Sequence, residues 1–185
     1  MGRVDINIVY LIIVVASILI SMTLHEIMHG LVGYWLGDDT AKHQGRLSLN
    51  PIRHIDPFLT IILPLVLAVA GLPIFGGAKP VQVNPYNLRW GEWGMALVAI
   101  AGPLTNLLIA FFTFGFWALF GAPTAGVGAM FLTTMVQVNL GFFIFNMIPI
   151  PPLDGSRVLY ALAPDFVRRA MMTIERFGLI AVFIL

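Results

Sequence analysis

The 185-residue sequence contains no cysteine. Disulfide bonds and thiolate metal sites are therefore excluded, and histidine and carboxylate side chains are the strong metal ligands that remain. Charged residues are also scarce, at 10% of the chain, against about 25% in soluble domains. With 59% hydrophobic residues and a mean hydropathy of +0.93, the composition is that of an integral membrane protein.

The chain also lacks a large excess of positive or negative charge. The net charge of +1 argues against nucleic acid as a partner. The sequence also shows no internal repeat of the kind that is common in transporters. The length allows a single membrane domain, residues 1–185, without a sizeable soluble domain.

Long apolar runs, by contrast, are frequent. Runs at about residues 6–36, 94–120 and 127–148 are long enough to cross a bilayer. The segment 58–75 is apolar but interrupted by proline and glycine, and we expect it to enter the membrane and return to the same side. The final nine residues, 177–185, would cover about 14 Å as a helix, well short of a hydrocarbon core of about 30 Å. We therefore expect a last span that is cut short; the alternative is a tail that is only partly inserted.

The region at about residues 43–85 carries the turn-rich and strand-like stretches. Within it, Gly45–Asn50 and Ala78–Asn84 alternate polar and apolar residues next to proline, which predicts two short β-strands. We expect these strands to pair with an unwound substrate. The predicted fold is thus an α-helical polytopic membrane protein, with a three-span core, a re-entrant segment with short strands and a partial last span.

The distribution of basic residues predicts the orientation. If 58–75 is re-entrant, nine of the ten Lys and Arg residues share one side of the membrane and only Arg3 lies opposite. By the positive-inside rule that side is cytosolic, and the N-terminus is outside. The nine residues are Lys42, Arg46, Arg53, Lys79, Arg89, Arg157, Arg168, Arg169 and Arg176.

The motif His25-Glu26-Ile27-Met28-His29 ends the apolar part of the first predicted span. Histidines four apart on a helix are separated by about 40° around the axis, so both rings can reach one point. Glu26 lies about 100° from His25, beside that point. This geometry suits a zinc site in which Glu26 takes a proton from metal-bound water. Alternatively, the two histidines cap a membrane helix at the headgroups.

Asp154 is the candidate third ligand. It follows the third predicted span, where a carboxylate is costly unless it is hydrated, paired or bound to a metal. The re-entrant topology places Asp154 on the same side as His29. His25, His29 and Asp154 would give one zinc ion per chain two nitrogens and one oxygen, with a fourth position open to water. The alternative is that Asp154 is only the N-cap of a following helix.

Several motifs in order resemble the site-2 protease family of intramembrane zinc metalloproteases. They are HEIMH, GRLSLNPIRHIDP, GAKPVQVNP, AGPLTN and NMIPIPPLDG, and together they cover about residues 11–175. The resemblance implies that His25, His29 and Asp154 bind zinc, that Glu26 is catalytic, and that Asn146 contacts the substrate or the transition state.

The same resemblance implies the function. We expect an endopeptidase that cleaves transmembrane protein substrates within or near their spans, in the plasma membrane of a prokaryotic cell, with the site near the cytosolic face. Two departures bear on substrate selection. The motif reads Pro-Leu-Asp-Gly where many members have Asn-Pro-Asp-Gly, and we expect neither the PDZ domain nor the nucleotide-sensing domain of some members. The chain resembles a minimal core.

Two rival functions use the same residues. A zinc or proton-coupled transporter could bind its cargo at His25, His29 and Asp154, although it would not need Glu26. A catalytically inactive binding module would not need the complete set. Asn146 could also serve only to hydrogen-bond another helix, and Asn106 could pack between helices or satisfy backbone groups near the site. The sequence does not indicate the oligomeric state.

Overall fold

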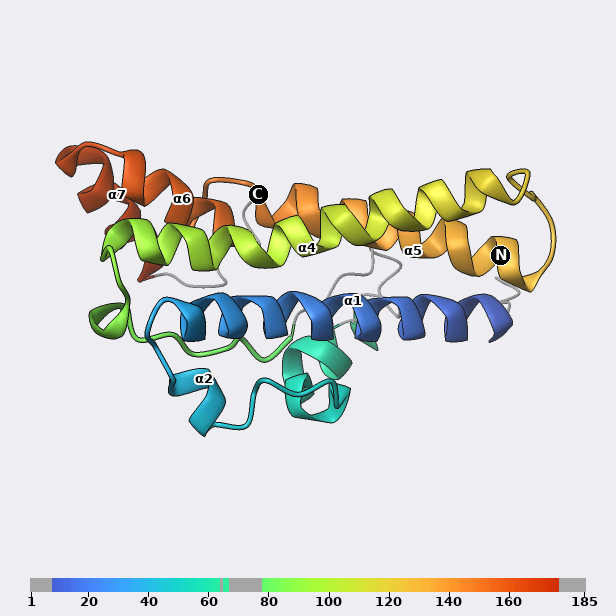
Figure 1. The fold of residues 1–185 in the computed structure, drawn as a ribbon, viewed down its shortest axis with the longest axis horizontal. Coiled ribbons are helices and arrows are strands. Elements are labelled where there is room, and N and C mark those ends of the chain that lie inside the picture. The colour runs from blue at the N-terminus through green and yellow to red at the C-terminus, as the bar shows by residue number, and fades with distance from the viewer. Residues whose placement is uncertain (1–7, 64, 67–77, 177–185) are drawn as a thin grey trace.

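Three long helices form the body of the protein. The computed structural model describes residues 8–63, 65–66 and 78–176. In it α1 spans Ile8–Trp35, α4 spans Glu92–Leu119 and α5 spans Val127–Asn146, and they run side by side in alternating directions (Figure 1). Each is long and apolar enough to cross a membrane, which confirms the three predicted spans. The expected partial span at 177–185 lies outside the described residues.

The helix α4 is the centre of this bundle and packs against α1 and α5. Its inner face is built from small residues, among them Ala96, Ala99 and Gly102, which allow the helix backbones to approach closely. Its outer face carries exposed aromatic residues such as Phe111 and Phe112. This is the pattern of a helix that faces partner helices on one side and lipid on the other.

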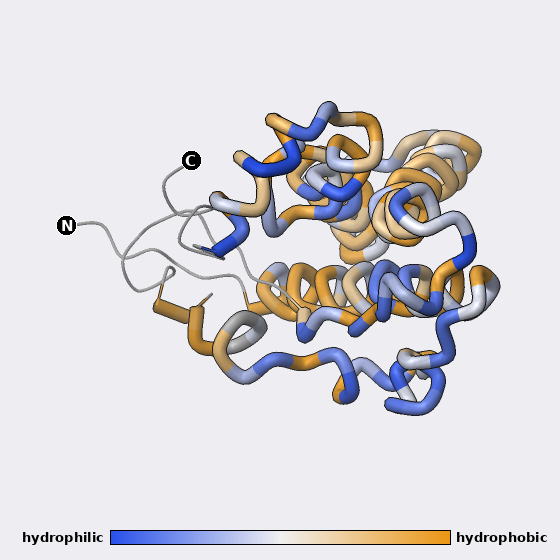
Figure 2. The backbone as a smooth tube through the Cα atoms, turned by 90° about the vertical axis from the view of Figure 1, so that its left-hand side faces the viewer, coloured by the Kyte–Doolittle hydropathy of each residue, from blue (hydrophilic) through white to orange (hydrophobic). Residues whose placement is uncertain are grey.

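The polar parts of the chain gather at one end of the bundle. There α1 ends, α4 begins, and three shorter helices follow: α2 (Thr40–His43), α6 (Asp154–Leu162) and α7 (Asp165–Glu175). Figure 2 looks onto this end and shows hydrophilic stretches around the ends of the apolar helices. An ion pair between Arg157 and Glu175 joins α6 to α7.

Short helical turns occupy the segment after α2. They are η1 (Pro51–His54), the π-helical turn η2 (Pro57–Ile62) and η3 (Pro85–Asn87). The side chains of Asn50 and Asn84 accept hydrogen bonds from Ile52 N and Tyr86 N and so cap η1 and η3. Most of the expected re-entrant segment, residues 67–77 in particular, lies outside the described residues.

The prediction of two short β-strands is wrong: the described residues contain no strand. Residues 78–84 are extended, but their backbone donors bond elsewhere: Lys79 N to His54 O, Val81 N to Glu26 Oε2 and Asn84 N to Asp38 Oδ2. No ladder can form when the donors are used by scattered acceptors. Residues 45–50 begin as a turn instead of a strand, with Gly45 N bonded to Lys42 O and Arg46 N to Ala41 O.

Asp38 anchors the extended segment to the end of α1. It is 1% exposed, and its carboxylate accepts hydrogen bonds from the backbone N–H of Asn84, the side chain of Asn87 and the backbone and hydroxyl of Thr40. Arg89 N also donates to Leu36 O. Burial alone would raise the pKa of Asp38, but these hydrogen bonds to the ionised form outweigh it and hold the pKa below its ordinary value.

Candidate metal centre

Three side chains from distant parts of the chain converge beside α4. His25 Nε2 and His29 Nε2 are 2.9 Å apart, and Asp154 Oδ2 lies 3.2 Å from the first and 3.3 Å from the second. Among the described residues, His25, His29 and Asp154 are the group of potential metal ligands that lies this close together. The structure thus brings together the three residues that the sequence indicated.

The helix α1 positions both histidines by its periodicity. His25 and His29 are one turn apart, and their rings meet edge to face with centroids 4.5 Å apart. Both residues are buried, as is Glu26 between them. The four-residue spacing therefore places the two Nε2 atoms at one point, as the motif predicts.

Asp154 reaches this point because the chain turns sharply after α5. Asp154 is the first residue of α6; Leu153 holds the N-cap position, and the helix has no side-chain cap. The alternative role of Asp154 as the N-cap is therefore not what the structure shows. The turn also requires Gly155, since a Cβ there would lie 2.4 Å from Met147 O.

Each histidine has an acceptor at its second ring nitrogen. His29 Nδ1 lies 2.7 Å from the backbone oxygen of Val98, and His25 Nδ1 lies 2.6 Å from Asn106 Oδ1. An acceptor at Nδ1 requires the proton to be on Nδ1, so the lone pair of each ring is on Nε2. Metal-binding histidines commonly have this arrangement of an outer acceptor and an inward lone pair.

The donor set fits a zinc ion. Two Nε2 lone pairs and a carboxylate oxygen within 3.3 Å of one another repel unless a proton or a metal ion lies between them. The separations are close to the roughly 3.3 Å expected between ligand atoms that are each about 2.0–2.1 Å from a tetrahedral zinc. Two histidines and one carboxylate are also a known zinc ligand set for hydrolysis.

Asp154 is suited to be the anionic ligand. Its Oδ2 lies 3.2 Å and 3.3 Å from the two Nε2 atoms. The ionised carboxylate supplies the negative charge that two neutral imidazoles lack, and it is the form that binds metal.

Gly102 of α4 closes one side of the centre. A Cβ at this position would lie 2.4 Å from His29 Nε2 and 2.6 Å from His25 Nε2. Any larger residue would occupy the space in which the ligand atoms meet. Glycine at position 102 therefore keeps α4 close to the centre without filling it.

Glu26 lies beside the three ligands and is held from outside the helix. Its Oε2 accepts a hydrogen bond of 2.8 Å from the backbone N–H of Val81. This contact uses the backbone group that a substrate strand was expected to pair with. The extended segment thus orients Glu26.

Asn146 has a different environment from the one expected. Its Nδ2 donates to Phe142 O, 3.0 Å away, within α5. This bond is internal to its helix, so a role for Asn146 with the substrate stays a prediction.

Sequence reasoning missed Asn139 and left Asn106 open. Asn106 forms a hydrogen bond with His25, and Asn139 forms one with Asn106. Both side chains are fully buried within apolar helices. The cost of burying an amide there is a signal that could have marked both residues, but it does not say which group each amide contacts.

Known proteins resemble this chain along most of its length. A family model described as "Peptidase family M50" matches residues 120–185, which include Asp154. The chain is 42% identical over 178 residues to "Putative zinc metalloprotease YwhC" of Bacillus subtilis (strain 168). The aligned region covers 92% of this chain and 78% of that protein. The chain is 30% identical over 175 residues to "Putative zinc metalloprotease Rip2" of Mycolicibacterium smegmatis, covering 94% of this chain and 66% of that protein. No solved structure gives a significant match.

Proposed function

Because the chain belongs to peptidase family M50, the site-2 protease family, and is a zinc metalloprotease, we propose that it cleaves transmembrane protein substrates within or near their spans, with Glu26 as the general base. The observation that carries this proposal is the meeting of His25, His29 and Asp154 beside Glu26 on an apolar helix. Membership in a peptidase family also argues against the alternative function as a transporter.

His25, His29 and Asp154 are the residues that would hold zinc. Bound there, zinc would lower the pKa of a coordinated water toward neutrality and polarise the substrate carbonyl. The chain's own contribution is to fix the three ligands from two separate helices, α1 and α6, against α4. We keep Asn146 as a candidate substrate contact.

Glu26 handles the proton. Its Oε2 is bonded to Val81 N, so Oε1 is the oxygen that accepts a proton from the attacking water. The same carboxyl group then passes this proton to the leaving amine. Burial of Glu26 keeps bulk water from competing for its Oε1.

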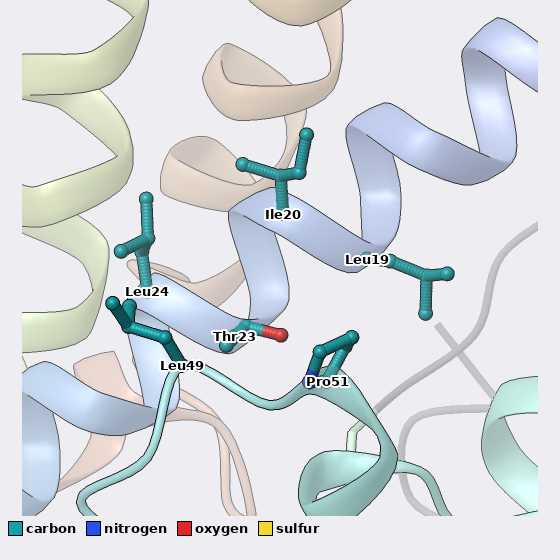
Figure 3. Close-up of a pocket in the computed structure, with 6 residues that line it drawn as sticks. All are labelled: Leu19, Ile20, Thr23, Leu24, Leu49 and Pro51. Atoms are coloured by element: carbon teal, nitrogen blue, oxygen red, sulfur yellow. The ribbon is translucent and has the colours of Figure 1, made fainter.

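An apolar groove along α1 offers the substrate a path to this carboxylate. Its lining residues are labelled in Figure 3: Leu19, Ile20, Thr23 and Leu24 of α1, and Leu49 and Pro51 of the neighbouring segment. Leu19, Thr23 and Glu26 are spaced i, i+4 and i+7, so the groove follows the helix face that leads to Glu26. Its volume of about 220 Å³ is below the about 300–1,000 Å³ of small-molecule sites, so it admits individual side chains of a span.

The basic residues and the fold together support an orientation. The ends of α1 and α5 and the start of α4 lie on the side of the bundle that carries α2, α6 and α7 (Figure 1). This side holds the basic residues of the loops, so we propose that it faces the cytosol of a prokaryotic cell. The metal centre then lies near the cytosolic face of the plasma membrane, where water can reach it.

The substitution Glu26→Gln tests the proposed function. The purified protein is reconstituted in vesicles with a panel of single-span substrates, and cleavage and zinc content are measured together. We expect Glu26→Gln to abolish cleavage and keep about one zinc per chain, as for loss of a general base. Glu92→Gln, an exposed change at the start of α4, is the matched control and should cleave normally.

A second variant separates the base from the ligands. His25→Ala should lose both zinc and cleavage, because it removes one of three ligands. Normal cleavage by Glu26→Gln would contradict the role of Glu26. Full zinc binding by His25→Ala would contradict the metal site itself.

A further inference from the structure

A line of buried polar groups lies behind His25 in the middle of the bundle. Ser21, Asn106 and Asn139 are each 0% exposed and belong to α1, α4 and α5 respectively. Buried amides among apolar helices are costly unless their hydrogen bonds are made. The bonds that these residues make have a defined direction, which ends at His25.

The direction is set first at Asn139. Its Nδ2 donates to the backbone oxygen of Met135 and to Ser21 Oγ, both 2.8 Å away. A carbonyl oxygen can only accept, so the nitrogen of the amide must face Met135. The oxygen of the Asn139 amide is consequently turned toward α4.

Asn106 receives this orientation and passes it on. Its Nδ2 donates to Asn139 Oδ1 at 2.8 Å and to the backbone oxygen of Ser21 at 3.4 Å. Its Oδ1 is therefore turned toward His25 Nδ1, 2.6 Å away. His25 must then carry its proton on Nδ1 and keep its lone pair on Nε2, which is the form that binds a metal.

The other histidine needs no such relay. The acceptor at His29 Nδ1 is the backbone oxygen of Val98, which is fixed by α4. The Asn106 amide, in contrast, could turn by 180° about its last bond and present a donor to His25. The ring would then carry its proton on Nε2, pointing at the metal position.

We propose that Asn139 is a positioning residue for zinc binding. It holds the Asn106 amide in the orientation that keeps His25 in its metal-binding tautomer. This inference rests on the proposed role of His25 as a zinc ligand. It adds that a side chain on α5, which touches no ligand, sets the affinity of the centre.

Zinc affinity is the direct test. The full chain in lipid nanodiscs is titrated with zinc against a chromogenic chelator. Loss of an outer partner of a metal-binding histidine typically costs about 10–100-fold in affinity, and we expect this for Asn106→Leu. Asn139→Leu, one bond further away, should cost about 3–10-fold. Thr134→Val, which changes another buried polar residue of α5, is the matched control and should bind zinc normally.

An Asn106→Asp background distinguishes positioning from a general structural effect. A carboxylate presents an oxygen to His25 whichever way it is turned, so Asn139 is no longer needed to orient it. Asn139→Leu should therefore change zinc affinity by less than about 2-fold in this background. Equal losses in both backgrounds, or no loss in either, would overturn the inference.

A variant that keeps the polarity of position 139 covers the case in which Asn139→Leu fails to fold. The side chain of Asn139→Ser is too short to reach Asn106. Like Asn139→Leu, it should lower zinc affinity in the unmodified chain and leave it nearly unchanged in the Asn106→Asp background. The outcome is separable from that of the proposed function. If His25→Ala loses zinc while Asn139→Leu and Asn139→Ser bind normally, the relay is wrong and the metal site stands.

Discussion

The carboxylate of Glu26 accepts a hydrogen bond from the backbone N–H of Val81, with 2.8 Å between Val81 N and Glu26 Oε2. The two residues are 55 positions apart, and the segment that carries Val81 is fixed to the end of α1 through Asp38 and Leu36. The candidate base is therefore oriented by a segment outside its own helix.

Removing this N–H should slow cleavage. Val81→Pro deletes the donor to Glu26, and we expect cleavage to fall by about 10-fold, the equivalent of one hydrogen bond to a charged group of about 1.5 kcal/mol. Zinc content should be unchanged, because the three ligands are not touched. Val81→Ala keeps the N–H and serves as the control. Equal cleavage by Val81→Pro and Val81→Ala would show that the contact has no part in the reaction.

A methyl group at position 102 should block the metal site. The Cβ of Gly102→Ala would lie 2.4 Å from His29 Nε2, so we expect zinc affinity to fall by more than about 10-fold. Gly115→Ala lies on the same helix with nothing within 4 Å of the added Cβ, and should bind zinc normally. Chelator competition measures both. Tight zinc binding by Gly102→Ala would mean that the metal does not lie between the two rings.

Filling the groove beside α1 should impair substrate cleavage alone. Leu49 lines the groove, whose volume is about 220 Å³, and Leu49→Trp places a bulkier side chain at its wall. We expect a reduced rate on membrane substrates at unchanged zinc content. Ile52→Trp is the matched control, because Ile52 is as exposed as Leu49, at 72% against 74%, and does not line the groove. Identical rates for the two variants would argue for another path.

Asp38 should stabilise the fold in a pH-dependent way. Its folded pKa lies below the unfolded value of about 3.9, so its contribution is present above that pH and is lost as the pH falls through the folded pKa. Asp38→Asn should lower the free energy of unfolding by about 2 kcal/mol at pH 7. We expect the difference in stability between Asp38→Asn and the unmodified protein, measured by thermal unfolding in detergent, to narrow below about pH 4.

The adjacent carboxylate provides the control for that experiment. Asp39 has a side chain that is 57% exposed and pairs with His43 at the surface, so Asp39→Asn should change stability by at most about 0.5 kcal/mol. A gap for Asp38→Asn that stays constant from pH 7 down to pH 3 would contradict the assigned cause.

The sequence predicted the parts of the fold that depend on local pattern. The three spans follow from apolar length, and the meeting of His25 with His29 follows from helical periodicity. Asp154 was also found in advance, because an unpaired carboxylate next to a span is costly and topology placed it on the correct side. In the structure its Oδ2 lies within 3.3 Å of both rings, while its role as a zinc ligand stays a prediction.

The strand predictions failed for a physical reason that sequence alternation cannot reveal. Residues 78–84 do run extended, but a strand needs a neighbour whose donors and acceptors match in register. Here Glu26 and Asp38 supply the acceptors as side chains, and they come from α1 and the turn after it. Alternation describes which side chains face inward and does not say where the backbone bonds are made.

The sequence by itself determined the membrane class and the three spans, and it singled out His25, Glu26, His29 and Asp154 as candidate site residues, because length, polarity cost and helical period are properties of neighbouring residues. Only the tertiary structure decided how those residues are held. The donor from Val81 to Glu26, the space left by Gly102 and the bonds from Asn139 through Asn106 to His25 each join separate elements. Hydrogen bonds and close contacts between such elements depend on distances that packing alone fixes.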